Sequence, residues 1–283
     1  MSHVHTEVLA QGLLFPEGPV WNRDTREWWF VELKGGHVSK VDASGRLDRV
    51  FDTLAPNGMK RHADGSFWIC ERDRKGLLRF DPGTRQAALI ADGCGGQPFL
   101  GPNDLCFGIA ERCYFTDPHG SSRTNPAGAL YRRDRDGKVT REVSGLAYPN
   151  GVALTPDGTR LVFAETHTQT IWIADRQPDG SLGGRRPFAR TEGGNGPDGM
   201  AFDSAGNLFV AVFGAGHVQV FDAQGRETER LDVPGKQPTN CCFGGKDFKT
   251  LCVTEAERGQ LLALELRTAG YALPPVTSDS VVF

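Results

Sequence analysis

The chain has 283 residues, of which 39% are hydrophobic and 24% are charged, a composition typical of a soluble globular protein. Its formal net charge of −3 provides no basic surface that would attract nucleic acid. The sequence contains no run of about 18 apolar residues, so no membrane span is predicted. The high counts of glycine (36) and proline (17) favour a fold with many tight turns.

The N-terminus and the cysteines predict a cytoplasmic protein. The first seven residues, MSHVHTE, lack the basic and apolar regions of a signal peptide. The seven cysteines are an odd number and show no Cys-x-x-Cys spacing, and Cys70, Cys113 and Cys252 lie in apolar runs. Reduced, buried thiols are the expectation.

One motif recurs along the chain, as in residues 196–212. It begins with a proline and a polar residue in a short apolar strand, and a polar turn and a second apolar strand follow. Its prolines follow one another at steps of 40 to 48 residues: Pro16, Pro56, Pro102, Pro149, Pro197 and Pro238. A repeat near this length with several short strands per unit is typical of propeller blades. The sequence therefore predicts an all-β, six-bladed β-propeller with very little helix, formed by residues 1–283 as a single domain.

The two ends of the chain are expected to close the ring. Residues 4–14 contain a strand-like segment ahead of the first repeat, and the last repeat reaches its third strand at residues 261–266. We expect the N-terminal segment to supply the outer strand of the last blade, which removes two exposed sheet edges.

The residue directly after each repeat proline carries a side-chain oxygen in every copy: Glu17, Asn57, Asn103, Asn150, Asp198 and Thr239. Equivalent positions at the start of the innermost strands should converge on the propeller axis at one end. Two carboxylates there would repel each other and be costly to bury without a cation. Carboxylate and amide oxygens suit a hard divalent cation, so the column predicts an axial metal site.

Not every member of this column is expected to be a ligand. If Asn57 also bound the cation, too few coordination positions would be left for a substrate, so a role in a turn is favoured for it. Thr239 is expected to line the wall of the tunnel.

Asp104 and His119 are candidates for substrate binding outside this column. Asp104 neighbours the ring, and His119 follows a strand end at the start of a longer loop, residues 119–129. Loops on the open face of such a ring are common places for substrate contacts. A lone histidine in a loop is more often only a surface residue, and this alternative stays open.

Four of these motifs, in order and at blade spacing, resemble the family of gluconolactonase, regucalcin and luciferin-regenerating enzyme. They are Pro16-Glu17-Gly18-Pro19, Pro102-Asn103-Asp104, Tyr148-Pro149-Asn150-Gly151 and Gly196-Pro197-Asp198-Gly199. The resemblance covers essentially the whole chain and implies a six-bladed propeller with one axial divalent cation. It implies that Glu17, Asn150 and Asp198 are ligands and that Asn103 completes the shell or contacts the substrate. Residues 114–126 also resemble lactonases that act on non-sugar lactones.

One position departs from this family pattern. Members that act on sugar lactones often carry an arginine two residues before the third-blade asparagine, where this chain has Gly101. The departure leaves open whether the substrate is a sugar lactone.

The resemblance implies a metal-dependent hydrolase of cyclic esters with a small lactone as substrate. Asp198 is the predicted general base, and a nucleophilic role stays open. Ca²⁺ is the first choice of ion, with Mn²⁺, Zn²⁺, Mg²⁺ or Fe²⁺ as alternatives. The rival hypotheses are an esterase or phosphotriesterase on the same metal site and a metal-stabilised binding module without turnover. The sequence does not indicate the oligomeric state.

Overall fold

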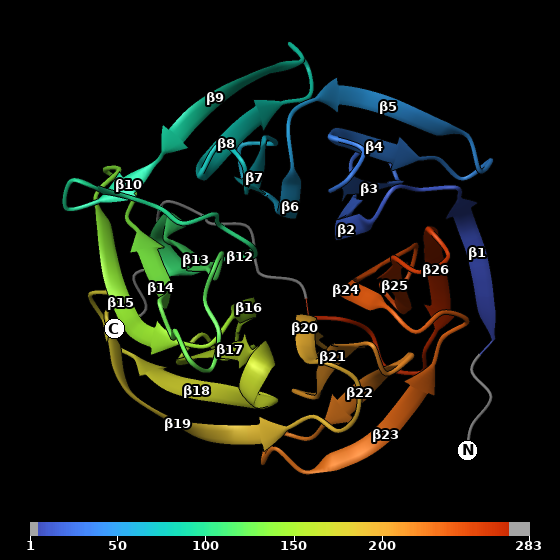
Figure 1. Cartoon of the computed structure of the whole chain (residues 1–283). Coiled ribbons are helices and arrows are strands. Elements are labelled where there is room, and N and C mark those ends of the chain that lie inside the picture. Colours follow the sequence, from blue (N-terminus) through green and yellow to red (C-terminus); the bar gives the residue numbers. More distant parts are fainter. Residues whose placement is uncertain (1–4, 272–283) are drawn as a thin grey trace.

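The structure is a computed structural model that describes residues 5–271. Six four-stranded antiparallel sheets stand around a central axis as the blades of a β-propeller, as the sequence predicts (Figure 1). The expected single domain of residues 1–283 also included residues 1–4 and 272–283, which lie outside the described residues.

Each blade runs outward from an innermost strand that begins at or near a repeat proline. Blades one and two comprise β2 (Pro16–Asn22), β3 (Glu27–Glu32), β4 (His37–Val41), β5 (Leu47–Asp52), and β6 (Pro56–Arg61), β7 (Phe67–Glu71), β8 (Gly76–Asp81), β9 (Gln86–Ala91). Blades three and four comprise β12 (Leu105–Phe107), β13 (Cys113–Asp117), β14 (Gly128–Arg133), β15 (Val139–Leu146), and β16 (Pro149–Leu154), β17 (Arg160–Glu165), β18 (Thr170–Arg176), β19 (Leu182–Arg190). Blade five comprises β20 (Gly196–Phe202), β21 (Leu208–Phe213), β22 (His217–Phe221) and β23 (Glu227–Asp232).

The sixth blade joins the two ends of the chain. It combines β24 (Pro238–Gly244), β25 (Thr250–Glu255) and β26 (Gln260–Glu265) with the N-terminal strand β1 (Thr6–Gln11). Strand β1 pairs antiparallel with β26, from Thr6 opposite Leu264 to Gln11 opposite Gln260. The predicted closure is therefore confirmed, and the ring has no gap between its first and last blades.

A small hairpin and two short 3₁₀ turns complete the regular elements. The hairpin is formed by β10 (Gly93–Cys94) and β11 (Gln97–Pro98), and the turns are η1 (Ile109–Glu111) and η2 (Thr166–Thr168). Among the described residues no helix is long and apolar enough to cross a membrane.

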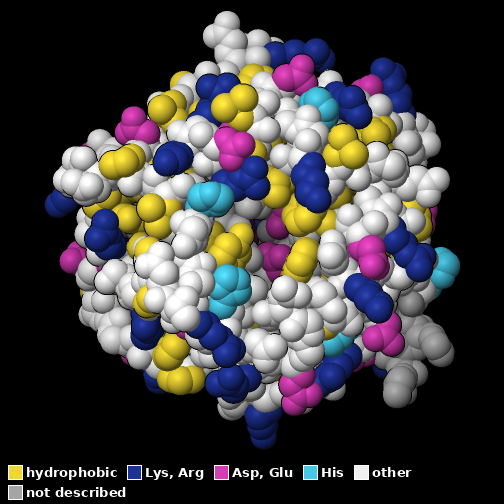
Figure 2. Space-filling model, in the orientation of Figure 1, with side chains coloured by type: hydrophobic (Ala, Val, Ile, Leu, Met, Phe, Trp, Pro, Cys, Tyr) yellow, Lys and Arg dark blue, Asp and Glu magenta, His cyan; other side chains and the backbone are white. Residues whose placement is uncertain are grey.

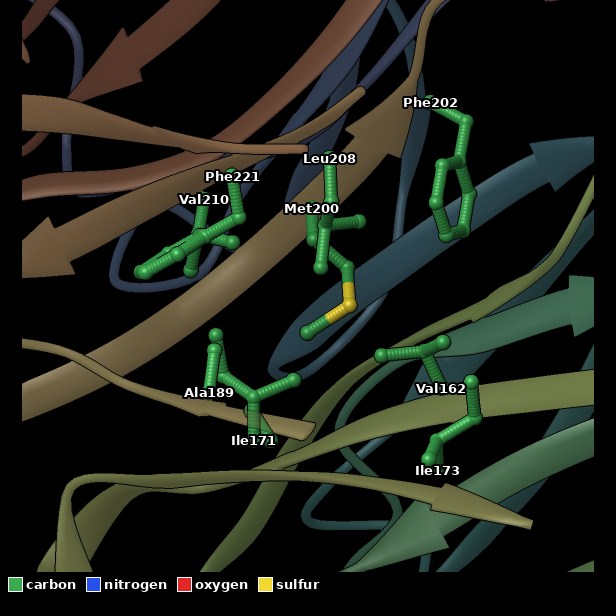
Figure 3. Close-up of a cluster of buried hydrophobic side chains, with 10 residues drawn as sticks. Val162, Ile171, Ile173, Ala189, Met200, Phe202, Leu208, Val210 and Phe221 are labelled. Carbon is green, nitrogen blue, oxygen red and sulfur yellow. The ribbon is translucent and has the colours of Figure 1, made fainter. Parts of the chain in front are cut away.

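The hydrophobic core is divided among the interfaces between neighbouring blades. Because side chains of a strand alternate between its two faces, an apolar run in a blade packs against both neighbours. In β3, Trp28 and Phe30 pack toward the sixth blade, whereas Trp29 and Val31 pack toward the second. Figure 3 shows the equivalent cluster between the fourth and fifth blades, with Met200 at its centre. Because both faces of a middle strand are buried, its sequence is a continuous apolar run and does not alternate between apolar and polar residues.

Candidate axial metal site

Six inner strands bring the residues of the proline column to one end of the axis. The six side chains lie between 0% and 7% exposed: Glu17, Asn57, Asn103, Asn150, Asp198 and Thr239. Figure 2 shows acidic side chains at the bottom of a central depression, with hydrophobic, histidine and Lys/Arg side chains around its rim. The fold thus places carboxylate and amide oxygens where the sequence predicted a shared site.

Hydrogen bonds between blades hold the backbone of this ring in place. The hydroxyl of Thr116 donates to the carbonyl of Asn150 at 2.7 Å, and that of Thr166 donates to the carbonyl of Pro197 at 2.7 Å. Thr239 donates in the same way to the carbonyl of Pro16 at 2.7 Å. The expected wall residue therefore ties the sixth blade to the first beside Glu17.

Glu17 and Asp198 form the acidic part of the site. Burial and the negative charge of Asp104 raise the pKa of Glu17 to about 7. Burial and the charges of Glu17 and Asp104 raise the pKa of Asp198 well above its usual value. Because the charge of Glu17 contributes to the raised pKa of Asp198, the two carboxyl groups lie near each other in a medium that solvates charge poorly.

The surrounding oxygen atoms fit a hard cation. Oδ1 of Asp198 and Oδ1 of Asn57 are buried without a hydrogen-bond partner among the described residues. Asn150 donates its amide N–H to Thr166 at 3.3 Å, which leaves its carbonyl oxygen for an acceptor role. In the described part of the chain there is no group of three or more His, Cys, Asp or Glu side chains that could hold a metal ion by themselves. A cation in this ring therefore needs asparagine oxygens in addition to the two carboxylates, a donor set that divalent ions such as Ca²⁺ accept.

A second layer of side chains fills the tunnel beneath the ring. The next position of the repeat is Gly in four blades, but it is Asp104 in the third and Asn240 in the sixth. A Cβ on Gly58 would lie 2.4 Å from Oδ1 of Asp104, and one on Gly199 would lie 2.0 Å from Cγ of Asn240. The glycines therefore make room for these two polar side chains.

Asn240 connects this layer with the ring. Its amide Nδ2 lies 3.1 Å from Oε2 of Glu17 and 3.4 Å from Oδ2 of Asp104. Lys60 faces the same layer, and although burial opposes its charged form, the carboxylate of Asp104 contributes to a raised pKa. Sequence reasoning did not identify Asn240 or Lys60.

The two predicted substrate-binding residues outside the column lie at different depths. Asp104 is 1% exposed and accepts the backbone N–H of Leu105 at 2.8 Å, so it belongs to the layer beneath the ring. His119 is exposed, in the loop that follows β13. Substrate contact by either residue stays a prediction.

A second repeating column also shapes the site. Five blades end their second strand in a buried carboxylate that accepts the backbone N–H of one or two of the three residues before the repeat proline. These residues are Glu32, Glu71, Asp117, Glu165 and Glu255. The signal was present in the sequence as an acidic residue at the end of the second apolar run in five of the six repeats, and it was missed.

The fold and the ring define the class of protein: a six-bladed propeller with an acidic, amide-rich site at one end of its axis. The chain belongs to the family described as SMP-30/Gluconolactonase/LRE-like region, whose profile matches residues 15–257. The resemblance seen in the sequence is thereby confirmed.

Individual relatives agree with this family assignment. The chain is 33% identical over 256 residues to pentonolactonase XacC of Haloferax volcanii, covering 89% of this chain and 84% of that protein. It is 30% identical over 272 residues to gluconolactonase of Zymomonas mobilis, covering 85% and 76%. The solved structure of a gluconolactonase from Xanthomonas campestris superposes with a TM-score of 0.83 at 28% identity, over 93% of this chain and 90% of that one.

Proposed function

We propose that the protein is a lactone hydrolase that works with a divalent cation held in the axial ring. The observation that carries the proposal is the burial of Glu17 and Asp198 close together, with one Asp198 oxygen left without a partner among the described residues. Relatives that cover most of the chain are named as pentonolactonase and gluconolactonase, which supports a cyclic ester as substrate.

The ligands that we propose are Glu17, Asn150 and Asp198, with Asn103 completing the shell or contacting the substrate. Ca²⁺ is the proposed ion because all of these donors are oxygens, and Mn²⁺, Mg²⁺, Fe²⁺ and Zn²⁺ are the alternatives. A bound divalent cation supplies a Lewis acid for the lactone carbonyl and offsets the charge that develops on its oxygen.

Asp198 is the proposed general base. Its carboxylate accepts a proton from water as the water oxygen bonds to the carbonyl carbon, and the ring acyl–oxygen bond then breaks. The same proton passes to the departing ring oxygen, which leaves a hydroxy acid. Burial and the charges of Glu17 and Asp104 raise the pKa of Asp198, which makes its carboxylate a stronger base than an ordinary exposed one.

Elemental analysis combined with a pH-indicator assay tests this function. Purified protein is expected to retain a divalent ion and to hydrolyse members of a lactone panel, and chelation should remove both properties. Aryl phosphotriesters in the same panel test the rival esterase chemistry by relative rate. Absence of lactone hydrolysis with every divalent ion would favour the binding-module hypothesis instead.

We also propose that the protein works in a reducing compartment such as the cytoplasm. All seven cysteines are free thiols, and five of them are buried. Unpaired thiols are typical of proteins from reducing environments.

A further inference from the structure

The space above the ring at Gly101 is occupied by a residue from the neighbouring blade. A Cβ on Gly101 would lie 3.1 Å from Cγ of Arg72 and 2.9 Å from Cβ of His119, and φ at Gly101 is +155°. A side chain at position 101 is therefore excluded, and the stem of Arg72 from the second blade lies where such a side chain would start.

The backbone of Arg72 is held firmly. Its N–H donates to the carbonyl of Ala55 at 3.0 Å, and its carbonyl accepts the N–H of Lys75 at 3.1 Å. In the side chain, Nε donates to Asp73 at 2.8 Å. The terminal NH₂ groups of the guanidinium have no hydrogen-bond partner among the described residues, and the side chain is 35% exposed. Arg72 thus offers a fixed, partly exposed pair of donors.

Tyr148, from the fourth blade, is near enough to Arg72 for each group to shift the pKa of the other. It immediately precedes Pro149 and has a φ of 65°, a strained value for a residue with a Cβ. Its N–H donates to the hydroxyl of Ser121 at 2.9 Å, and its ring lies 4.9 Å from that of His167. Burial and the charge of Asp198 raise the pKa of the phenol, while Arg72 lowers it. The phenol therefore lies within electrostatic reach of both Arg72 and Asp198.

Two arginines lie on this side of the depression: Arg72, which is ion-paired with Asp73 at 2.8 Å, and Arg123. The guanidinium of Arg123 is hydrogen-bonded through Nε to the carbonyl of His167, next to Tyr148. Asp73 offsets part of the charge of Arg72, so with a divalent ion on Glu17 and Asp198 the positive groups that an anion meets here are Arg123 and the unpaired end of the Arg72 guanidinium.

We propose that Arg72, together with the hydroxyl of Tyr148, selects lactones that carry a carboxylate substituent on the ring. The inference rests on the proposed lactone hydrolysis and adds its substrate class. Arginine binds a carboxylate through two parallel N–H bonds, a geometry that neutral hydroxyl or methyl substituents do not match.

A matched pair of lactones tests the proposal. γ-Carboxy-γ-butyrolactone and γ-methyl-γ-butyrolactone differ only in the substituent, and the measured quantity is the ratio of their kcat/KM values. Wild type is expected to prefer the carboxylate, and Arg72→Met should lower the ratio by about tenfold to a hundredfold, as expected for loss of a hydrogen-bonded ion pair. Methionine keeps most of the apolar stem that packs at Gly101.

The control variant is Arg74→Met, which removes an exposed charge from the same turn and should leave the ratio within about twofold. Thermal unfolding of both variants checks the fold. An unchanged ratio in Arg72→Met, an equal fall in Arg74→Met, or a wild-type preference for the methyl lactone would overturn the proposal.

Binding of the ring-opened products separates this proposal from the proposed function. Calorimetric titration of the two hydroxy acids, into protein with and without Ca²⁺, needs no turnover. Arg72→Met should weaken binding of the dicarboxylate about tenfold or more relative to the monocarboxylate. If wild type hydrolyses neither lactone but this binding difference is found, lactone hydrolysis fails and carboxylate recognition stands; equal weakening of both acids contradicts carboxylate recognition.

Discussion

The side-chain amide of Asn240 lies 3.1 Å from Oε2 of Glu17 and 3.4 Å from Oδ2 of Asp104. One residue of the sixth blade therefore connects a proposed metal ligand of the first blade with a buried carboxylate of the third. Such a partner fixes the direction in which a ligand points and the charge it carries.

Asn240→Ala should weaken metal binding without removing any ligand. Loss of its hydrogen bond leaves Oε2 of Glu17 with the backbone N–H of Gly18 as its remaining partner, and changes of this kind typically lower metal affinity about tenfold to a hundredfold. Calcium affinity, measured by competition with a chromophoric chelator, checks the prediction. Asn207→Ala is the control because Asn207 donates to Asp203 in the turn between β20 and β21; an equal loss of affinity there would contradict a specific role for Asn240.

Gly199 and Asn240 should show strong coupling in a double-mutant cycle. A Cβ at residue 199 would lie 2.0 Å from Cγ of Asn240, so Gly199→Ala should destabilise the protein by about 1–3 kcal/mol through overpacking. In an Asn240→Ala background the added methyl group enters vacated space, and the cost should fall by about 1 kcal/mol or more. Urea unfolding of the four proteins gives the coupling energy, and simple additivity would show that the two side chains do not compete for space.

Asp198→Asn should remove turnover and keep the fold. General acid–base catalysis contributes about 10²–10⁴-fold, so kcat for the best lactone should fall by at least about that much. The matched control in the same blade is Asp203→Asn, since Asp203 is equally buried but accepts the N–H groups of Ala205 and Asn207 in a turn. Asp203→Asn is expected to lose stability and retain activity per folded molecule. Near-normal turnover by Asp198→Asn would exclude Asp198 from the chemistry.

The proline column could be read from the sequence because the repeat itself fixes its geometry. Glu17 and Asp198 are far apart in the chain, but both follow a proline that begins an innermost strand, and a ring of equivalent strands must bring them together. Closure by β1 followed from the same periodicity, because the last repeat lacked its outer strand.

Asn240 and Arg72 could not be found in this way. Asn240 occupies a column of mostly glycine, and its importance depends on the empty space that Gly199 leaves in the next blade. Arg72 follows the second strand of one blade and reaches over Gly101 of another, a relation that no spacing in the sequence encodes. Such contacts depend on how a side chain of one blade packs against the backbone of the next, which the repeat pattern does not specify.

The acidic residue at the end of the second strand should contribute to stability in each blade that has one. Glu255 is fully buried and accepts the backbone N–H groups of Gln237 at 2.8 Å and Arg258 at 2.7 Å. Glu255→Gln replaces an acceptor by a donor and should cost about 1–3 kcal/mol in the free energy of unfolding. Glu7→Gln on the exposed strand β1 is the control, with an expected change within about 0.5 kcal/mol. Equal effects of the two substitutions would contradict a clamping role for Glu255.

The metal-free protein should lose stability as the pH rises toward neutrality. The pKa of Glu17 is raised from 4.5 to about 7 by burial and by the charge of Asp104, so the folded state favours the protonated form. The stabilisation from this group is complete below the unfolded pKa of 4.5 and is lost as the pH rises through about 7. A shift of this size corresponds to a change on the order of 3 kcal/mol in the free energy of unfolding.

A bound divalent ion should reverse this trend because it binds the ionised carboxylates of the folded state. We therefore expect the Tm in chelator to fall between about pH 5 and about pH 8, and Ca²⁺ to raise it most at the higher pH. Glu17→Gln provides the control, since it removes the titrating group and should flatten the part of the pH dependence that Glu17 causes. A Tm in chelator that rises with pH, or an effect of Ca²⁺ that is independent of pH, would show that the ring carboxyls are not the groups that bind the ion.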